Sequence, residues 1–234
     1  MARVKKVNNE IKKRQLLKNQ KLERRLGNRK NRERILIVCE GEKTEPLYFK
    51  EFAKLLPKST AQVAEAEKPV IDITGRGMNT LRLVQETITI KNQREDESGI
   101  PYTQVWAVFD KDDFPKELYN EAINSALDEG IQCAYSNEAF ELWYLLHFND
   151  YEDAAKCHQY AKRLSSALGE KYIKNDPKIY EKLQRLGNEE LACSRAKKLC
   201  SIAEASKPNM FADHNPSTSV YKLVRILREI IDNS

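Results

Sequence analysis

The sequence predicts an α/β protein with a mainly parallel, four-stranded sheet flanked by helices. Short apolar runs, of the length of buried strands, alternate with longer segments of helical periodicity between residues 34 and 136. This order is typical of parallel strands joined by crossover helices. A hydrophobic content of 41% in 234 residues also provides enough apolar surface for a core. We therefore expect an α/β core over 34–136, a helical region over 137–234 packed on it, and a basic extension over 1–33.

Four strands and three helices are expected in the core. The strands are predicted at residues 35–39, 69–75, 103–110 and 131–136, and the helices at 44–56, 78–93 and 114–130. Pro46 is tolerated because it falls in the first turn of the first helix, and Gly130 ends the third. The polar segment 92–102, which contains a glycine and a proline, is predicted to be a loop.

The region after residue 136 carries helical patterns. Helices are predicted within residues 139–148, 151–168, 177–186, 189–205 and 217–231. Trp143, Leu145 and Leu146 fall on apolar positions, so they are expected in the core. Ser217 is predicted to cap the last helix, and His147 to lie at a helix end rather than to bind a metal.

The chain carries its positive charge near the N-terminus. Residues 1–34 hold 14 Lys and Arg against 3 Glu, which is +11, whereas residues 35–234 hold 26 basic and 32 acidic residues, which is −6. A basic extension on an acidic body predicts contact with nucleic-acid phosphates, an attraction that needs no base-specific contacts. A solvated basic helix that only aids solubility is the alternative. The extension lacks aromatic residues, which disfavours a membrane-surface role.

Other classes of protein are disfavoured by what the sequence lacks. No apolar run approaches the ~20 residues that span a bilayer, and the N-terminus has no apolar segment of a secretory signal. The five cysteines include no Cys-x-x-Cys pair and no Cys/His cluster, which disfavours a zinc site and indicates reduced thiols. The sequence therefore predicts a cytoplasmic protein that does not bind membranes.

Acidic residues follow two of the predicted strands at the point where each strand ends. Glu40-Gly41 follows the first strand, and Asp110-Lys111-Asp112 follows the third. The carboxyl ends of parallel strands meet at one edge of the sheet, where ligands bind in this fold class. Alternation along an extended segment places Asp110 and Asp112 on one side and Lys111 on the other. Gly41 lets a backbone or a phosphate approach closely.

Three carboxylates at one edge predict a site for Mg²⁺ or Mn²⁺. Hard divalent cations prefer carboxylate oxygens and keep waters and a phosphate as further ligands. Without a cation, the like charges of Glu40, Asp110 and Asp112 repel and raise at least one pKa. The alternative for the aspartates alone is capping of the next helix. The two motifs together favour the cation and a catalytic set for phosphodiester hydrolysis, in which Glu40 is either a ligand or a general acid/base.

The two motifs resemble those of the Toprim domain of topoisomerases, bacterial primases and several nucleases. That family has a Glu, usually followed by Gly, after its first strand and an Asp-x-Asp after a later strand. Glu40-Gly41 matches the first motif, and Asp110-Lys111-Asp112 matches the second. The resemblance implies a Toprim-like fold for residues 34–136 and a metal-dependent activity on phosphodiester bonds.

A resemblance to the RloB-like family covers most of the chain after residue 30. It rests on five blocks in order: VCEGEKTEPLYF, GRGMNTLRLV, VFDKDDF, SNEAFELWYLLHF and NPSTSVYKLV. The resemblance implies a Toprim-like, metal-dependent nuclease in prokaryotic antiviral defence or abortive infection. Its substrate would be RNA (tRNA included) or DNA, and its partner an ATPase or another defence protein. Two alternatives stay open: a primase-like nucleotidyl transferase on the same carboxylates, and a non-catalytic nucleic-acid-binding sensor.

Several further residues are candidates for the site. Nucleases of the overcoming-lysogenization-defect type have a second Glu four residues after the first; Thr44 stands there in this chain, so Glu42 and Glu45 are the nearest candidates for a second metal. Glu141 is a further metal candidate, with complementation of the helix dipole as its alternative role. The predicted substrate-binding residues are Gly41, Arg76, Lys111, Asn137 and His214. For Arg76, an ordinary strand–helix turn is the alternative to phosphate binding.

Overall fold

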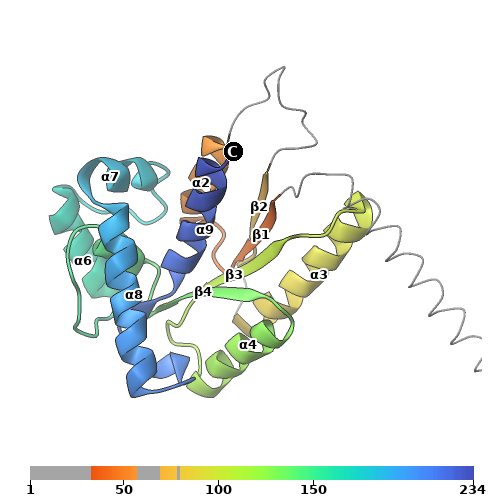
Figure 1. Ribbon diagram of the computed structural model, residues 1–234. Coiled ribbons are helices and arrows are strands. Elements are labelled where there is room, and N and C mark those ends of the chain that lie inside the picture. Colours follow the sequence, from red (N-terminus) through yellow and green to blue (C-terminus); the bar gives the residue numbers. More distant parts are fainter. Residues whose placement is uncertain (1–32, 57–68, 78–79) are drawn as a thin grey trace, which may run out of the picture.

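A computed structural model of the protein describes residues 33–56, 69–77 and 80–234 and shows one sheet between two layers of helices (Figure 1). The strands are β1 (Arg34–Cys39), β2 (Val70–Gly75), β3 (Gln104–Asp110), β4 (Gln132–Asn137) and β5 (Ser217–Thr218), in the order β2-β1-β3-β4-β5. β1 to β4 are parallel, and β5 pairs antiparallel with β4. The described residues thus confirm a mostly parallel α/β sheet, with five strands rather than the four predicted.

The strand order places the ends of β1 and β3 side by side. The chain crosses from β1 to β2 on one side of β1 and then to β3 on the other, so β1 has both as neighbours. Ile37 of β1 pairs with Ile73 of β2 and with Trp106 of β3. The carboxyl ends of β1 and β3 therefore meet at a switch in strand order, the usual place for a ligand in such sheets.

Helices cover both faces of the sheet. α3 (Thr80–Ser98) and α4 (Lys116–Asp128) cover one face, and α2 (Thr44–Leu55) with the C-terminal helices covers the other (Figure 1). The C-terminal helices are α5 (Glu141–Leu146), α6 (Cys157–Leu168), α7 (Ile179–Leu186), α8 (Glu189–Ser206) and α9 (Val220–Asp232). Side chains of β1 alternate between the layers: Ile35 and Ile37 face α2 and the C-terminal helices, and Leu36 and Val38 face α3 and α4.

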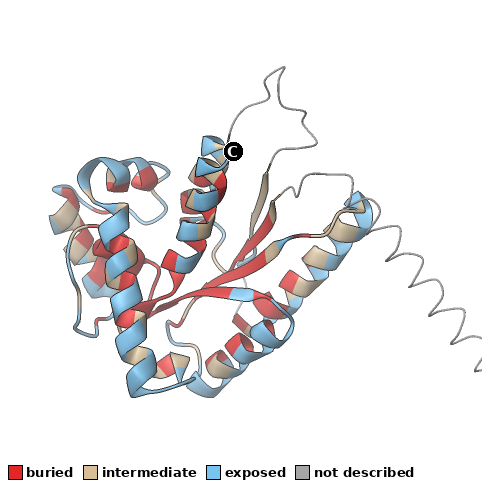
Figure 2. Cartoon of the chain, viewed as in Figure 1, coloured by how far each residue is buried: buried red, intermediate tan, exposed pale blue. Residues whose placement is uncertain are grey.

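The inner strands are buried on both faces (Figure 2). Residues 35–39 have no exposed surface, which explains why β1 is a continuous apolar run rather than an alternating one. Trp143, Leu145 and Leu146 of α5 are also fully buried, as predicted. Because α5 and β1 belong to the same apolar cluster, the helix is fixed against the sheet.

The predicted loop over residues 92–102 is wrong for residues 92–98, because α3 continues to Ser98, and is confirmed for residues 99–102. Two helix-type contacts support its last turns: Gln93 Nε2 donates to Glu97 Oε1 (2.8 Å), and Ser98 Oγ donates to Arg94 O (2.6 Å). Such contacts between residues four apart help a polar helix that has few apolar anchors. The glycine and proline of this segment lie beyond the end of the helix.

The segment before the last helix also differs from the prediction. Ser217 does not cap a helix, because Ser217 and Thr218 form β5 and pair with the end of β4. Ser219 precedes α9, and its hydroxyl donates to Cys133 O (3.0 Å) instead of capping the helix. A strand of two residues has no periodicity that a sequence can display, which explains the error.

The predicted basic extension, residue 33 apart, lies outside the described residues. Its contact with nucleic acid therefore stays a prediction. In the ranges that the structure does describe, no helix is long and apolar enough to cross a membrane. Four cysteines of these ranges are free thiols: Cys39, Cys133, Cys193 and Cys200.

Acid is expected to destabilise the fold through His147, at the C-terminal end of α5. The residue is 2% exposed, its Nδ1 is hydrogen-bonded to Trp143 O (3.0 Å), and its Nε2 has no hydrogen-bond partner. Burial lowers the pKa of His147 to about 4, and Arg195 acts in the same direction while Glu189 opposes it. The unfolded-state pKa is ~6.5. The contribution of the neutral His147 ring to the free energy of unfolding is therefore complete above pH ~6.5. As the pH falls toward 4, the free energy of unfolding should decrease by ~3 kcal/mol because of this ring.

Urea unfolding between pH 7.5 and 4 checks this expectation. His147→Gln removes the titrating ring, so the loss of unfolding free energy over this interval should shrink by roughly the same ~3 kcal/mol. A variant whose stability falls with pH as steeply as that of the wild type would show that other groups cause the loss.

Candidate functional site

Glu40 lies at the end of β1 and is held against the end of β3. Its backbone N–H donates to Val108 O (2.8 Å), which continues the pairing of the two strands by one residue. Its Oε2 accepts the backbone N–H of Asp110 (3.2 Å), and its Oε1 accepts the hydroxyl of Thr80 at the start of α3 (3.4 Å). Both carboxylate oxygens therefore have a defined orientation at the edge of the sheet.

Asp110 and Asp112 come together through a turn rather than through strand alternation. β3 ends at Asp110, and Asp112 has a φ of 36°, which is outside extended backbone. Lys111 N–H donates to Ser136 O (2.8 Å) and Asp112 N–H to Glu138 O (3.0 Å), so the turn is tied to the end of β4. Both aspartates line one cavity of about 320 Å³. The predicted alternation is thus wrong, although the two carboxylates do share one cavity.

Two more predicted carboxylates join the same edge. Glu45 is only 5% exposed, in the first turn of α2. Glu141, in the first turn of α5, is 8% exposed and lines the cavity with Asp110 and Asp112. Its Oε1 accepts the hydroxyl of Tyr172 (3.1 Å). Five carboxylates from three segments of the chain (40–45, 110–112 and the start of α5) therefore gather at the ends of β1 and β3.

Burial and mutual repulsion raise the pKa of three of these carboxyls. The pKa of Glu40 is raised to about 7 by burial and by Glu45 and Asp112, against the opposing hydrogen bond from Asp110 N–H. The pKa of Glu45 is also raised to about 7, by burial and then by Glu141 and Asp112. Burial, followed by Glu45, Glu141 and Asp112, raises the pKa of Asp110 well above its usual value. A positive charge bound at this edge of the sheet would therefore relieve the repulsion among the carboxylates.

Two buried carboxylate oxygens of the site, Glu45 Oε2 and Asp110 Oδ1, have no hydrogen-bond partner. An unpartnered buried oxygen is costly, and a hard divalent cation would supply the missing partner. The donor set therefore fits Mg²⁺ or Mn²⁺ in its chemistry. Within residues 33–56, 69–77 and 80–234, no three His, Cys, Asp or Glu side chains are placed closely enough to hold a metal ion. The carboxylates would have to draw together around a cation.

Three further polar side chains line the carboxylate cavity, and no sequence motif predicts them there. They are His158 of α6, and Tyr172 and Lys174 from the segment between α6 and α7. Lys174 lowers the pKa of Glu45 and so opposes the repulsion among the carboxylates. These residues reach the site through the packing of α6 beside α5, and they carry no motif of their own.

Arg76 and Lys111, two of the predicted substrate-binding residues, have other partners. Arg76 forms an ion pair with Glu86 of α3 (3.4 Å). Lys111 is 9% exposed, and its ammonium donates to Phe114 O and lies over the ring of Tyr119 (5.9 Å to the centroid). Neither side chain lines the carboxylate cavity. Both side chains thus have partners within the chain, and their roles in substrate binding stay predictions.

Asn137 and His214 hold the segment before β5. Asn137 Nδ2 donates to Phe211 O (3.2 Å) and to Ala212 O (3.0 Å). His214 Nε2 is hydrogen-bonded to Lys207 O (2.7 Å). Both residues are 2% exposed, and neither lines the carboxylate cavity. Both side chains thus hold this segment in place, and their roles in substrate binding stay predictions.

Two glycines set how closely the segments of the site approach. A Cβ on Gly41 would lie 2.2 Å from Glu45 Oε2, so the space predicted for a phosphate is occupied by a carboxylate. A Cβ on Gly75, at the end of β2, would lie 2.4 Å from Gly41 O and 2.8 Å from Glu42 Cα. Because these are backbone atoms, a Cβ on Gly75 could be accommodated only if the backbone of residues 40–45 shifted, and that shift would move Glu40 and Glu45.

Gly75→Ala should therefore displace the segment that carries Glu40 and Glu45. We expect a loss of ~1–3 kcal/mol in unfolding free energy, the usual cost of overpacking. Any nuclease activity should fall at least ~10-fold even at temperatures where the variant is fully folded, because misplacing a catalytic group by about 1 Å can cost more than that. Urea unfolding and a cleavage assay at 15 °C measure the two effects. Wild-type behaviour in both assays would show that the segment can move without consequence.

Comparison with known proteins places the chain in a family. The comparisons with curated proteins and with solved structures found no match. The family model described as RloB-like protein matches residues 35–227. This range contains β1 from Ile35 onward, the other four strands and all five carboxylates of the site. The chain therefore belongs to the RloB-like family.

Proposed function

We propose that the protein is a divalent-metal-dependent nuclease that hydrolyses phosphodiester bonds of RNA or DNA. One observation supports this most strongly: five carboxylates converge at a switch in strand order, and two of their oxygens are buried without a partner. Raised pKa values at a cleft are typical of functional sites, because a protein rarely keeps such repulsion for stability alone. Membership of the RloB-like family and the mostly parallel sheet agree with a Toprim-like enzyme.

The proposed ligands of the cation are Asp110 and Asp112. Glu40 is either a third ligand or the general acid/base, and Glu45 and Glu141 are candidates for a further position. The chemistry that Mg²⁺ or Mn²⁺ supplies when bound is Lewis-acid stabilisation of the charge that develops on a phosphate. Aspartate and glutamate oxygens are the ligands that these cations prefer.

Other groups of the chain would position the substrate and move a proton. Glu40 has both oxygens oriented, by Asp110 N–H and by the Thr80 hydroxyl, so it is held ready to accept a proton from water or to return one to the leaving oxygen. Tyr172 orients Glu141 by its hydrogen bond. Lys174 lines the cavity and would pair with a phosphate oxygen.

The biological setting of the proposal rests on the family and on composition. We place the activity in the cytoplasm, in antiviral defence or abortive infection, under the control of a partner ATPase or another defence protein. The 14 Lys and Arg of residues 1–34 would raise the local concentration of nucleic acid without choosing its sequence.

Cleavage assays with purified protein test the proposal. RNA and DNA are incubated with Mg²⁺ or Mn²⁺ and wild type, Glu40→Gln or Asp112→Asn. We expect cleavage that requires the cation and falls at least ~100-fold in both variants. Glu42→Gln is the matched control and should cleave like the wild type, because Glu42 is exposed, lies against Gly77 and is not among the carboxylates that raise the pKa of Glu40, Glu45 or Asp110. Equal cleavage by all four proteins would refute the assignment, and so would polymer formation from nucleotides without cleavage.

A further inference from the structure

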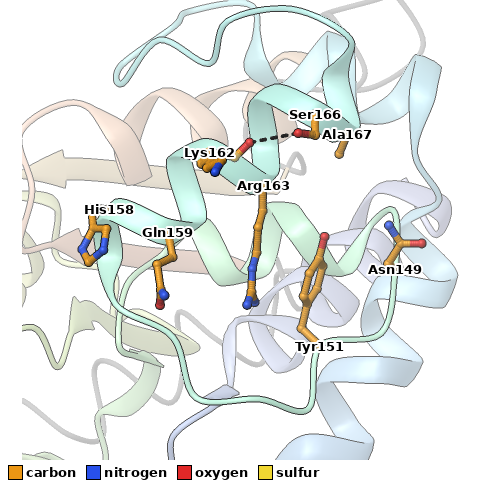
Figure 3. A pocket seen from close by; sticks show the side chains of 8 residues that line it. All are labelled: Asn149, Tyr151, His158, Gln159, Lys162, Arg163, Ser166 and Ala167. Atoms are coloured by element: carbon orange, nitrogen blue, oxygen red, sulfur yellow. Dashed lines mark hydrogen bonds between the residues drawn. The ribbon is translucent and has the colours of Figure 1, made fainter.

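A second cavity, of about 690 Å³, runs along α6 beside the carboxylate cavity. Figure 3 shows the side chains that line it, which come from α6 and from the segment between α5 and α6. The lining contains two cationic side chains, Lys162 and Arg163, one aromatic ring, Tyr151, and no carboxylate. We call this cavity the α6 groove and define it by Asn149, Tyr151, His158, Gln159, Lys162, Arg163, Ser166 and Ala167.

The α6 groove and the carboxylate cavity are contiguous. His158 lines both of them, and the next turn of α6 contributes Ala161 to the carboxylate cavity and Lys162 to the groove. A chain molecule that occupies the groove would therefore lie beside the cavity that Asp110 and Asp112 line. The groove is thus placed as an approach to the candidate catalytic site.

The charge of this part of the chain differs from that of its surroundings. Residues 156–174 hold five Lys and Arg against one Glu, which is +4, whereas residues 35–234 as a whole carry −6. A polyanion is repelled by the body and by the carboxylate cluster, so it needs local positive charge to come close to them. α6 and the segment after it supply that charge at the border of the site.

Tyr151 and Arg163 form a stacked pair inside the groove. The guanidinium carbon of Arg163 lies over the Tyr151 ring, 5.3 Å from its centroid, and Figure 3 shows the two side chains lying side by side. Both residues are half-buried, so part of each stays accessible. Aromatic rings and guanidinium planes are the surfaces on which proteins stack nucleic-acid bases.

We propose that the α6 groove binds a single-stranded or unpaired segment of nucleic acid and delivers it to the carboxylates. This inference deepens the proposed nuclease function and rests on it for the cleavage reaction. Lys162 and Arg163 bind the phosphates, and the Tyr151–Arg163 pair stacks a base. The strand is unpaired because the bases of a duplex are stacked on one another, where Tyr151 cannot reach them.

Binding measured without cleavage tests this inference. Fluorescence anisotropy with a labelled 12-nucleotide single strand, in EDTA and from 0.1 to 0.4 M salt, is compared for the full-length wild type and variants. Tyr151→Ala should weaken binding about 5- to 100-fold without changing the salt slope, and Tyr151→Phe should restore it. Lys162→Gln/Arg163→Gln should weaken binding and lower the salt slope by about 1.4, for two phosphate contacts at ~0.7 each.

The matched control removes the same two charges elsewhere. Lys197 and Arg225 are exposed and line a different cavity, between α8 and α9, which also contains carboxylates. Lys197→Gln/Arg225→Gln should therefore bind the strand like the wild type. The same sequence as a duplex should bind the wild type more weakly than the single strand.

The outcomes separate this inference from the nuclease assignment. Loss of binding in the groove variants, with no cleavage by the wild type in Mg²⁺ or Mn²⁺, would support the groove and refute the nuclease. Wild-type binding by Tyr151→Ala and by the double variant would overturn the groove even if the wild type cleaves. Equal losses in the groove and control variants, or a preference for duplex, would also overturn it.

Discussion

Asp110→Asn should lower the rate of metal-dependent cleavage at least ~100-fold. The same variant should nevertheless be at least as stable as the wild type when no divalent cation is present. Asp110 stands at the end of β3 with Oδ1 buried and without a hydrogen-bond partner. The same carboxylate is one of the proposed ligands. Activity and stability are therefore expected to change in different directions.

The expected gain in stability follows from the raised pKa of Asp110. Burial, and then the charges of Glu45, Glu141 and Asp112, raise this pKa well above its usual value. The folded-state pKa of Asp110 thus lies above its unfolded-state pKa, which is ~3.9. The contribution of this carboxyl to the free energy of unfolding is therefore complete only below the unfolded-state pKa. It is lost as the pH rises through the folded-state pKa. At pH 8 without a cation, the wild type thus carries an unfavourable carboxyl that asparagine removes.

Thermal unfolding at pH 8, in EDTA and in Mg²⁺, measures this effect beside the cleavage assay. The cation should raise the Tm of the wild type, because a ligand that binds only the folded state stabilises it, and should raise the Tm of Asp110→Asn by less. Asp113→Asn is the matched control, since Asp113 is exposed and does not line the cavity. It should keep both the activity and the response to the cation. Retained cleavage by Asp110→Asn would contradict its assigned role.

Phe49→Ala should cost ~4 kcal/mol of unfolding free energy, enough to unfold a large share of a marginally stable protein. Phe49 of α2 is fully buried. Its ring lies 5.3 Å from that of Tyr48 and 5.9 Å from that of Phe140, measured between centroids. Phe140 directly precedes Glu141, and Phe49 shares α2 with Glu45. The aromatic cluster therefore holds two carboxylate-bearing segments together.

Urea unfolding of Phe49→Ala and Leu55→Ala checks the prediction. Leu55 is on the same helix but 44% exposed, so its truncation should cost less than ~1 kcal/mol. Similar losses in the two variants would show that the α2 contact with the core is not specific.

The sequence predicted the parallel part of the fold largely because its inner strands β1 and β3 are buried on both faces. Such strands are continuous apolar runs, and β1 shows this in residues 35–39. β5 was not predicted, because its two residues show no sequence pattern of their own and form a strand only by pairing with β4. The last turns of α3 were also not predicted, because contacts such as Gln93 to Glu97 stabilise a polar segment that resembles a loop.

The sequence predicts those residues of the candidate site that lie at the ends of strands. Glu40 and Asp110 each stand at the end of a strand, and topology alone brings the ends of β1 and β3 together. Glu45 and Glu141 were expected as candidates, and burial at the same edge is what the structure adds. Lys174 could not be predicted, because it comes from a segment whose place depends on the packing of α6. Tertiary contacts of that kind leave no local pattern.

Isothermal titration of the full-length protein with Mn²⁺ at pH 7.5 examines the carboxylate cluster itself, independently of any substrate. We predict at least one Mn²⁺ bound per wild-type chain, with affinity at least ~10-fold lower in Asp110→Asn, which removes an anionic ligand, and unchanged in Asp113→Asn. Absence of binding by the wild type, or equal binding by wild type and Asp110→Asn, would show that these carboxylates do not form a cation site.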